Sequence, residues 1–131
     1  LSKEKSEIKI INIDGDDLRN ISKNKDYSKE GRIKNISTAI SIMRFLANKG
    51  YICVVSIVAP YKFLRDELKD EFPFLEVYLH TSEIRGREDY FAKDYEIPTD
   101  PDTLSIDTGK LTIKESTDEI LNVYWKMATL A

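Results

Sequence analysis

Short apolar runs alternate along much of the chain with segments in which apolar side chains recur every three or four residues. The apolar runs have the length of β-strands and are nearly uninterrupted, which is typical of parallel strands buried on both faces. They cover residues 8–14, 51–59, 75–80 and 104–107. The alternation of strand and helix patterns predicts an α/β fold with a mostly parallel sheet flanked by helices.

Three helices are expected in the segments with helical periodicity. Ser28 can cap the first, which ends at Lys49-Gly50 with a cation in its last turn and a glycine at its exit. Thr112 and Glu115 form a capping-box pair that begins the last one. A shorter helix is expected over residues 61–71. The apolar face of the first helix comprises Ile33, Ile36, Ile40, Met43 and Ala47, and that of the last comprises Ile120, Leu121, Tyr124 and Met127.

Two stretches lack such periodicity. Residues 20–31 are polar and rich in lysine, and we expect them to form a loop. Residues 82–103 are rich in charged and aromatic residues and contain Pro98 and Pro101. Connections of that length in compact domains often serve as lids or binding loops.

Length, charge and cysteine content limit the classes of protein to which the chain can belong. A chain of 131 residues that is 41% hydrophobic fits a single domain with a buried core. A net charge of −3 offers no broad attraction for nucleic acid or for an anionic membrane, and no apolar run is long enough to span a bilayer. The single cysteine, Cys53, cannot form an intramolecular disulfide, which is compatible with a cytoplasmic protein.

Candidate chemistry follows the first apolar run. Asp14-Gly15-Asp16 stands directly after it, and Arg19 follows three residues later. Ligands bind outside the carboxyl ends of parallel strands, so two acids and an arginine there indicate a site. The alternative is a polar turn, because Asp-Gly is a common turn signal. Further polar clusters begin at Ala59 and at Thr81, after other strands, and we expect all three to converge on one edge of the sheet.

Four segments in order resemble the adenylylsulfate kinase family, whose members phosphorylate the ribose 3′-hydroxyl of adenosine 5′-phosphosulfate. The resemblance runs from about residue 8 to the end of the chain. The segments are Asp14-Gly15-Asp16-Asp17-Leu18-Arg19; Tyr27-Ser28 with Arg32 and Asn35; Ala59-Pro60-Tyr61 with Arg65-Asp66; and Glu76-Val77-Tyr78 with Thr81. Phe91-Ala92-Lys93 and Asp94-Tyr95-Glu96 are similar to the remainder of that family's lid.

The resemblance implies the three-layer fold of P-loop nucleotide kinases, ATP as phosphoryl donor and Mg²⁺ as cofactor. Asp14 and Asp16 would lie beside the attacking hydroxyl and the magnesium ion, one of them as base or orienter. Which of the two is the base is left open. Homodimers are common in that family, and the sequence itself does not decide the oligomeric state. The implied substrate-binding residues are Arg19, Tyr27, Arg32, Asn35, Ala59, Pro60 and Tyr61, and the implied lid residues on the ATP side are Arg85 and Lys93.

The chain departs from the family in two respects. It contains no G-x-x-x-x-G-K-[ST] loop to hold the ATP phosphates. It begins at Leu1 rather than methionine, and we expect that loop upstream of Leu1. The lid is also shorter, because the family's Phe-Thr-Gly segment between the stretches matched by Lys93 and Asp94 is missing. Loss of that phenylalanine would remove one stacking face for the acceptor base, worth about 1–3 kcal/mol.

Three functions remain open at this point. The first is an ATP-dependent 3′-kinase of a small nucleotide. In its short lid and in Tyr27 the chain resembles a shortened branch of the family, found in capsule gene clusters, that phosphorylates cytidine diphosphoramidate, and this resemblance places that nucleotide slightly ahead as acceptor. The second is an adenylylsulfate kinase of sulfate assimilation. The third is a non-catalytic module that binds a nucleotide and has lost ATP binding. No nucleic-acid or membrane partner is expected.

Overall fold

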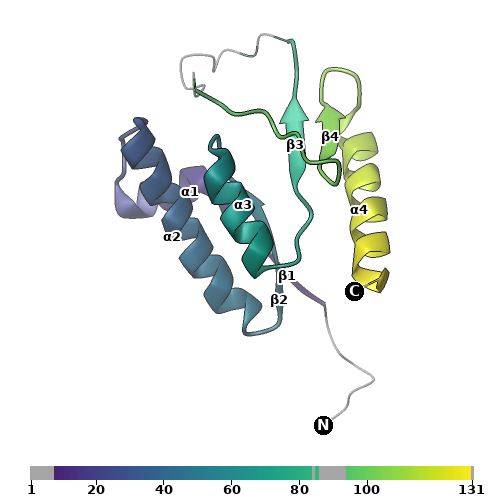
Figure 1. Cartoon of the computed structure of the whole chain (residues 1–131), viewed down its shortest axis with the longest axis horizontal. Coiled ribbons are helices and arrows are strands. Elements are labelled where there is room, and N and C mark those ends of the chain that lie inside the picture. Colours follow the sequence, from purple (N-terminus) through teal and green to yellow (C-terminus); the bar gives the residue numbers. More distant parts are fainter. Residues whose placement is uncertain (1–7, 84, 86–93, 131) are drawn as a thin grey trace. The chain divides into compact units, whose positions relative to one another are not determined.

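The computed structural model describes residues 8–83, 85 and 94–130 of the chain. Contacts divide the chain into two compact units, Leu1–Ala59 and Pro60–Ala131. Each unit contains two parallel strands and two helices (Figure 1). The prediction of an α/β fold with parallel strands flanked by helices is therefore confirmed.

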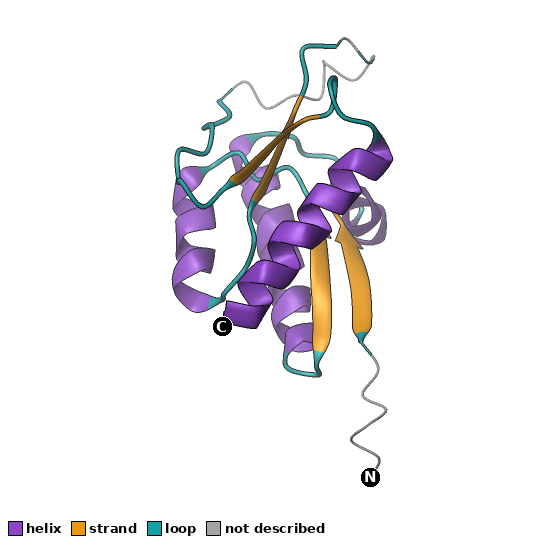
Figure 2. Ribbon diagram, turned by 90° about the vertical axis from the view of Figure 1, so that its right-hand side faces the viewer, coloured by secondary structure: helices purple, strands orange, loops and turns teal. Residues whose placement is uncertain are grey.

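The first unit is a strand–helix–helix–strand arrangement. Its elements are β1 (Lys9–Asp14), α1 (Gly15–Ser22), α2 (Lys29–Ala47) and β2 (Tyr51–Ser56). The strands pair in parallel, with a register that runs from Lys9 opposite Tyr51 to Asp14 opposite Ser56. Figure 2 shows the two strands of this pair side by side.

The core of the first unit lies between the strands and the two helices. Ile13, Leu18 and Ala39 are buried at its centre. Partly buried side chains that surround them are Ile42, Met43, Leu46, Cys53 and Ile57. Cys53 thus packs as a small hydrophobe against this core, and burial raises the pKa of its thiol.

Helix α2 begins where the sequence predicts. Ser28 is its N-cap, and the Ser28 hydroxyl accepts a hydrogen bond from the Gly31 N–H at 3.3 Å. The predicted apolar face is buried or half-buried except at Ala47, which is exposed. The helix ends at Ala47, and Gly50 has a φ of 88°, the left-handed conformation that glycine adopts without strain.

Helix α1 was not predicted, because residues 20–31 read as a loop. The helix is only eight residues long, and its buried residues are Gly15 and Leu18. A segment with one buried apolar side chain has no helical periodicity to detect. Strand β2 is also shorter than the predicted run of residues 51–59. Because β1 ends at Asp14 opposite Ser56, the residues after Ser56 have no partner on β1.

The second unit contains α3 (Lys62–Glu71), β3 (Val77–His80), β4 (Leu104–Asp107) and α4 (Ile113–Leu130). The two strands pair in parallel from Val77 opposite Leu104 to His80 opposite Asp107. The predicted capping box forms at the start of α4, where the Thr112 N–H donates to Glu115 Oε1 at 2.9 Å and the Glu115 N–H donates to Thr112 Oγ1 at 3.1 Å. No helix in the described part of the chain is long and apolar enough to cross a membrane.

Candidate active site

Asp14 ends strand β1 and begins helix α1. Its Oδ1 atom accepts hydrogen bonds from the backbone N–H groups of Asp16 at 2.8 Å and Asp17 at 3.3 Å. These contacts satisfy two of the N–H groups that the first turn of a helix leaves unpaired. The sequence Asp14-Gly15-Asp16 is therefore a helix cap at the carboxyl end of a parallel strand, where the sequence predicted a site or a turn.

Asp16 lies in the first turn of α1 and is exposed. One oxygen of Asp14 is held by the cap, whereas the side chain of Asp16 has no hydrogen bond with a described residue. Gly15 between them is buried, and a Cβ added there would stand 3.1 Å from Ile57 Cγ1 and 3.5 Å from Asn35 Nδ2. This close approach accounts for glycine at residue 15.

Arg19 lies over the ring of Tyr27. Its guanidinium carbon is 4.1 Å from the ring centroid, which is a close cation–π contact. Arg19 Nη1 donates to the carbonyl oxygens of Asn24 at 3.2 Å and Asp26 at 2.9 Å and to Asn24 Oδ1 at 3.3 Å. Its Nε and Nη2 atoms have no hydrogen-bond partner among the described residues. Through its Nη1 atom, the guanidinium group of Arg19 thus holds the loop between α1 and α2.

The loop of residues 23–28 is tightly hydrogen-bonded, although the sequence singled out only Tyr27 and Ser28 among its members. Lys23 turns the chain with a φ of 58°, and Asn24 Oδ1 accepts from the Asp26 N–H at 2.9 Å. Asp26 Oδ1 accepts from the Ser28 N–H at 2.9 Å. Hydrogen bonds from the side chain and backbone of Ser28, helped by the charge of Arg19, hold the pKa of Asp26 below its ordinary value of 3.8.

Arg32 and Asn35 project from the buried side of α2. Both side chains are polar, yet each residue is only 5% exposed. Arg32 Nε donates to the Tyr27 carbonyl at 3.0 Å, and its guanidinium carbon lies 5.6 Å from the Tyr27 ring centroid. The structure therefore brings Arg19, Tyr27 and Arg32 into one cluster, as the resemblance implied.

Asn35 carries a buried acceptor without a partner. Its Nδ2 donates weakly to the Gly15 carbonyl at 3.4 Å, whereas its Oδ1 is buried and has no hydrogen bond with the described residues. A buried polar atom left unpaired costs about 1–3 kcal/mol, so such atoms often mark a place where a ligand binds.

Pro60 and Tyr61 begin the second unit, and Ala59 ends the first. Pro60 and Tyr61 are both buried. The Glu96 N–H donates to the Pro60 carbonyl at 2.8 Å, and Glu96 Oε1 accepts from the Lys62 N–H at 2.8 Å. Glu96 thus caps α3, whose own N-cap residue, Tyr61, provides no side-chain cap.

Arg85 also belongs to the second unit. It bonds to Glu83 Oε2 at 2.9 Å through Nη2 and to Thr108 Oγ1 at 3.1 Å through Nη1. It therefore lies at the carboxyl end of the β3–β4 pair. Lys93, expected on the ATP side, lies outside the described residues.

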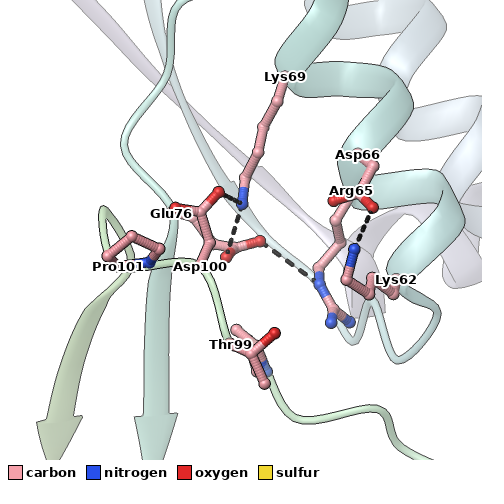
Figure 3. Close-up of a pocket in the computed structure, with 9 residues that line it drawn as sticks. Lys62, Arg65, Asp66, Lys69, Glu76, Thr99, Asp100 and Pro101 are labelled. Carbon is pink, nitrogen blue, oxygen red and sulfur yellow. Dashed lines mark hydrogen bonds and ion pairs between the residues drawn. The ribbon is translucent and has the colours of Figure 1, made fainter.

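A pocket of about 230 Å³ in the second unit is lined by ion pairs and differs from the predicted site (Figure 3). Glu76 lies 3.4 Å from Arg65 Nε and 3.2 Å from Lys69 Nζ, and Lys69 also reaches Asp100 at 3.0 Å. Burial alone would lower the pKa of Lys69, but its hydrogen bonds to Asp100 and Glu76 outweigh burial and raise it. Since each cation faces a carboxylate, this pocket stabilises the fold and offers no surplus charge for a ligand.

Whether the chain can hold a metal ion by itself depends on which ligand side chains lie close together. Among residues 8–83, 85 and 94–130, no three Asp, Glu, His or Cys side chains gather closely enough to hold a metal ion. Mg²⁺ commonly takes only one or two protein carboxylates and completes its shell with water and nucleotide phosphates. Asp14 and Asp16 fit that smaller role.

Comparison with known proteins identifies the family. The family model described as adenylylsulphate kinase matches residues 1–93. The adenylyl-sulfate kinase of Lactiplantibacillus plantarum is 29% identical over 132 aligned positions, which cover 84% of this chain and 63% of that protein. The probable adenylyl-sulfate kinase of Pyrococcus abyssi is 28% identical, with 86% and 76% covered.

Two further similarities complete the comparison. The probable bifunctional SAT/APS kinase 2 of Sorangium cellulosum is 32% identical over 83% of this chain, which spans only 22% of that protein. The chain thus covers less than two thirds of the Sorangium and Lactiplantibacillus proteins. The structure of the Mycobacterium tuberculosis APS kinase in complex with AMPPNP and APS has a TM-score of 0.70 at 19% identity, covering 92% of this chain and 82% of that one. That likeness establishes the fold, and the matched family model establishes that this chain belongs to the adenylylsulfate kinase family.

Proposed function

We propose that the protein is an ATP-dependent kinase that phosphorylates the ribose 3′-hydroxyl of a small nucleotide. The observation that carries this proposal is the unpaired Oδ1 of Asn35, which is buried beside Gly15 and stands one helical turn after Arg32 on α2. A hydroxyl or amino group of a bound nucleotide would satisfy that acceptor. Membership of the family gives the reaction class its support.

The acceptor would be held from several sides by residues of the first unit. The Tyr27 ring is 40% exposed and can stack on a base, while the guanidinium groups of Arg19 and Arg32 beside it suit phosphate or sulfate oxygens. Asn35 would hydrogen-bond to the same molecule. The resemblance also implied Ala59, Pro60 and Tyr61 as acceptor-binding residues, and that part of the expectation stays a prediction.

The two carboxylates would have different tasks. Because Oδ1 of Asp14 holds the helix cap, we assign Asp14 to positioning the turn and Asp16 to orienting or deprotonating the acceptor hydroxyl. When bound, Mg²⁺-ATP supplies the phosphoryl group and neutralises charge on it. Arg85 and Lys93 are proposed for the ATP side. The 131 residues contain no Walker A loop, so no donor-side contact is assigned to them beyond these two.

Adenylylsulfate is the acceptor that the comparisons favour. The Lactiplantibacillus protein is named adenylyl-sulfate kinase, the Pyrococcus protein is named probable adenylyl-sulfate kinase, and the Mycobacterium structure is a complex with AMPPNP and APS. Cytidine diphosphoramidate, which the short lid placed slightly ahead, gains no support from any of them. We therefore propose adenylylsulfate first and keep the cytidine nucleotide as the competing acceptor.

The test is steady-state turnover by the full-length protein with Mg²⁺-ATP and each acceptor. We expect adenylylsulfate to be phosphorylated, and Asp16→Asn to lower kcat by at least about 100-fold, the size of a general-base contribution. Asp17→Asn is the matched control, because Asp17 is an exposed acid in the same turn and should keep activity. Preference for the cytidine nucleotide would reverse the choice of acceptor.

A non-catalytic nucleotide-binding module remains the alternative of another class, motivated by the missing phosphate loop in these residues. Isothermal titration calorimetry separates the two. A kinase binds both the acceptor and Mg²⁺-ATP, whereas a module binds the acceptor alone. Full activity of Asp16→Asn would also contradict the proposed chemistry.

A further inference from the structure

We infer that Asn24 is a positioning residue for the acceptor, because its amide joins α1, the 23–28 loop and α2 behind the Arg19–Tyr27 stack. The inference rests on the proposed function, since it concerns how the acceptor side is held in shape. Asn24 belongs to none of the motifs that carried the family resemblance.

Asn24 makes hydrogen bonds in three directions. Its Oδ1 accepts from the Asp26 N–H at 2.9 Å and from Arg19 Nη1 at 3.3 Å, and its Nδ2 donates to the Gly31 carbonyl at 3.1 Å. Its backbone also takes part, because its N–H donates to the Arg19 carbonyl at 3.1 Å and its carbonyl accepts from Arg19 Nη1 at 3.2 Å. One half-buried residue thus contacts the end of one helix, the loop and the first turn of the next helix.

Only an amide side chain of this length fits these contacts. Aspartate would keep the two bonds accepted by Oδ1 but would place a second oxygen against the Gly31 carbonyl, where a donor is needed. Alanine would remove all three side-chain bonds. Arg19 would keep its contact with the Asp26 carbonyl but lose a planar acceptor that fixes its orientation over Tyr27.

Loss of the Asn24 side chain is expected to weaken acceptor binding. Tyr27 is fixed from the Arg32 side by the bond from Arg32 Nε to its carbonyl, and from the Arg19 side by a guanidinium that Asn24 orients. Without Asn24 the loop samples more conformations, and the acceptor must order it on binding. A loss of this kind raises the KM for the acceptor while kcat at saturation and the KM for ATP change little.

The test compares Asn24→Ala and Asn24→Asp with Asn20→Ala in the full-length protein. Asn20 is a matched control, since it is an exposed asparagine on α1 with no hydrogen bond from its side chain to a described residue. We expect both Asn24 variants to raise the KM for adenylylsulfate by about tenfold, with kcat within about twofold and the KM for ATP unchanged. Asn20→Ala should match the wild type in all three constants.

A double-mutant cycle distinguishes positioning from general stability. In a Tyr27→Ala background, Asn24→Ala should add little further loss of acceptor affinity, because both changes act through the same stack. Calorimetry with adenylylsulfate measures this affinity without turnover. Additive losses, or unchanged affinity in folded Asn24 variants, would overturn the inference.

Two other outcomes are equally decisive. If both Asn24 variants lose the fold, as monitored by circular dichroism, Asn24 is a structural residue and the inference is wrong. If the wild-type protein binds neither adenylylsulfate nor cytidine diphosphoramidate, the proposed function fails and the inference fails with it. If the wild type binds and the Asn24 variants bind equally well, the inference alone fails.

Discussion

Gly31 lies against the backbone of Asp26 so closely that no other residue fits at this position. A Cβ added to Gly31 would stand 2.1 Å from the Asp26 carbonyl oxygen and 2.6 Å from Asp26 Cβ. The same carbonyl accepts a hydrogen bond from Arg19 Nη1 at 2.9 Å. The Asp26 carbonyl oxygen therefore contacts both Gly31 in the first turn of α2 and the guanidinium group of Arg19.

Gly31→Ala is expected to displace the loop and weaken acceptor binding. Relief of the clash requires movement of the Asp26 backbone, since a carbonyl oxygen cannot rotate away as a flexible side chain could. Overpacking of this kind costs about 1–3 kcal/mol of stability, although alanine favours the helix. Chemical denaturation and acceptor titration measure the two effects.

Lys34→Ala serves as the control for Gly31→Ala. Lys34 is exposed on the same helix, and its replacement should leave both the free energy of unfolding and the acceptor affinity unchanged within error. Wild-type acceptor affinity in Gly31→Ala would show that the loop does not need the geometry described here.

Two variants of Asp14 test its role as the N-cap of α1. Asp14→Ala removes the acceptor for the N–H groups of Asp16 and Asp17 and should lower the free energy of unfolding by about 1 kcal/mol. Asp14→Asn keeps an equally good cap, so its stability should match the wild type. Urea denaturation of the two variants provides the measurement, and equal destabilisation of both would contradict the capping role.

The elements with local signals were predictable from the sequence. Ser28 caps α2, and the pair of Thr112 and Glu115 caps α4, because the groups that satisfy each helix end lie within three residues of it. Strand β4 matches the predicted Leu104–Asp107, in which the apolar Leu104 and Ile106 alternate with polar residues, the pattern of a half-buried strand. Helix α1 was missed because its stability comes from the Asp14 cap and the burial of Leu18, not from periodicity.

The site was predictable only in part. The resemblance pointed to Arg19, Tyr27, Arg32 and Asn35. The structure places both arginines against Tyr27, and Asn35 follows Arg32 by one turn of α2. Helical periodicity places Arg32 and Asn35 on the same face as the buried Ile36 and Ala39, but it cannot tell which of their polar atoms find partners. Asn24 was missed because its bonds depend on the path of the loop, which the left-handed turn at Lys23 determines. The predicted convergence of Asp14 with Ala59 and Thr81 spans both units and stays a prediction.

The carboxylate of Asp26 makes a pH-dependent contribution to the free energy of unfolding. Its folded-state pKa is lowered, first by the hydrogen bonds from Ser28, so the contribution is fully present above the ordinary value of 3.8. The contribution is lost as the pH falls through the folded-state pKa. We expect Asp26→Asn to be less stable than the wild type at about pH 6, and the difference to shrink at about pH 3. Thermal unfolding at the two pH values checks this, and a difference that grows with acid would contradict the sign.

Glu76 is the central carboxylate of the second unit, and its loss should cost far more than loss of an exposed one. Its side chain is 11% exposed, and it faces Arg65, which is 9% exposed at its side chain, and Lys69. It also accepts a hydrogen bond from the hydroxyl of Thr103. Glu76→Gln would leave two cations, one of them buried, without their shared counter-charge. Removing one member of a buried ion pair costs about 3–5 kcal/mol.

Asp66→Asn is the matched comparison for Glu76→Gln. Asp66 pairs with Lys62 on the surface of α3, where the side chains are 47% and 54% exposed. Exposed pairs of this type contribute about 0–1 kcal/mol because water and salt screen them. Denaturation should be done with urea, which is uncharged and does not screen ion pairs. The free energies of unfolding of the two variants should differ by at least about 2 kcal/mol. Equal losses would mean that the Glu76 network is as solvated as the surface pair, and that Arg65 is held mainly by its 2.6 Å bond to the Glu96 carbonyl.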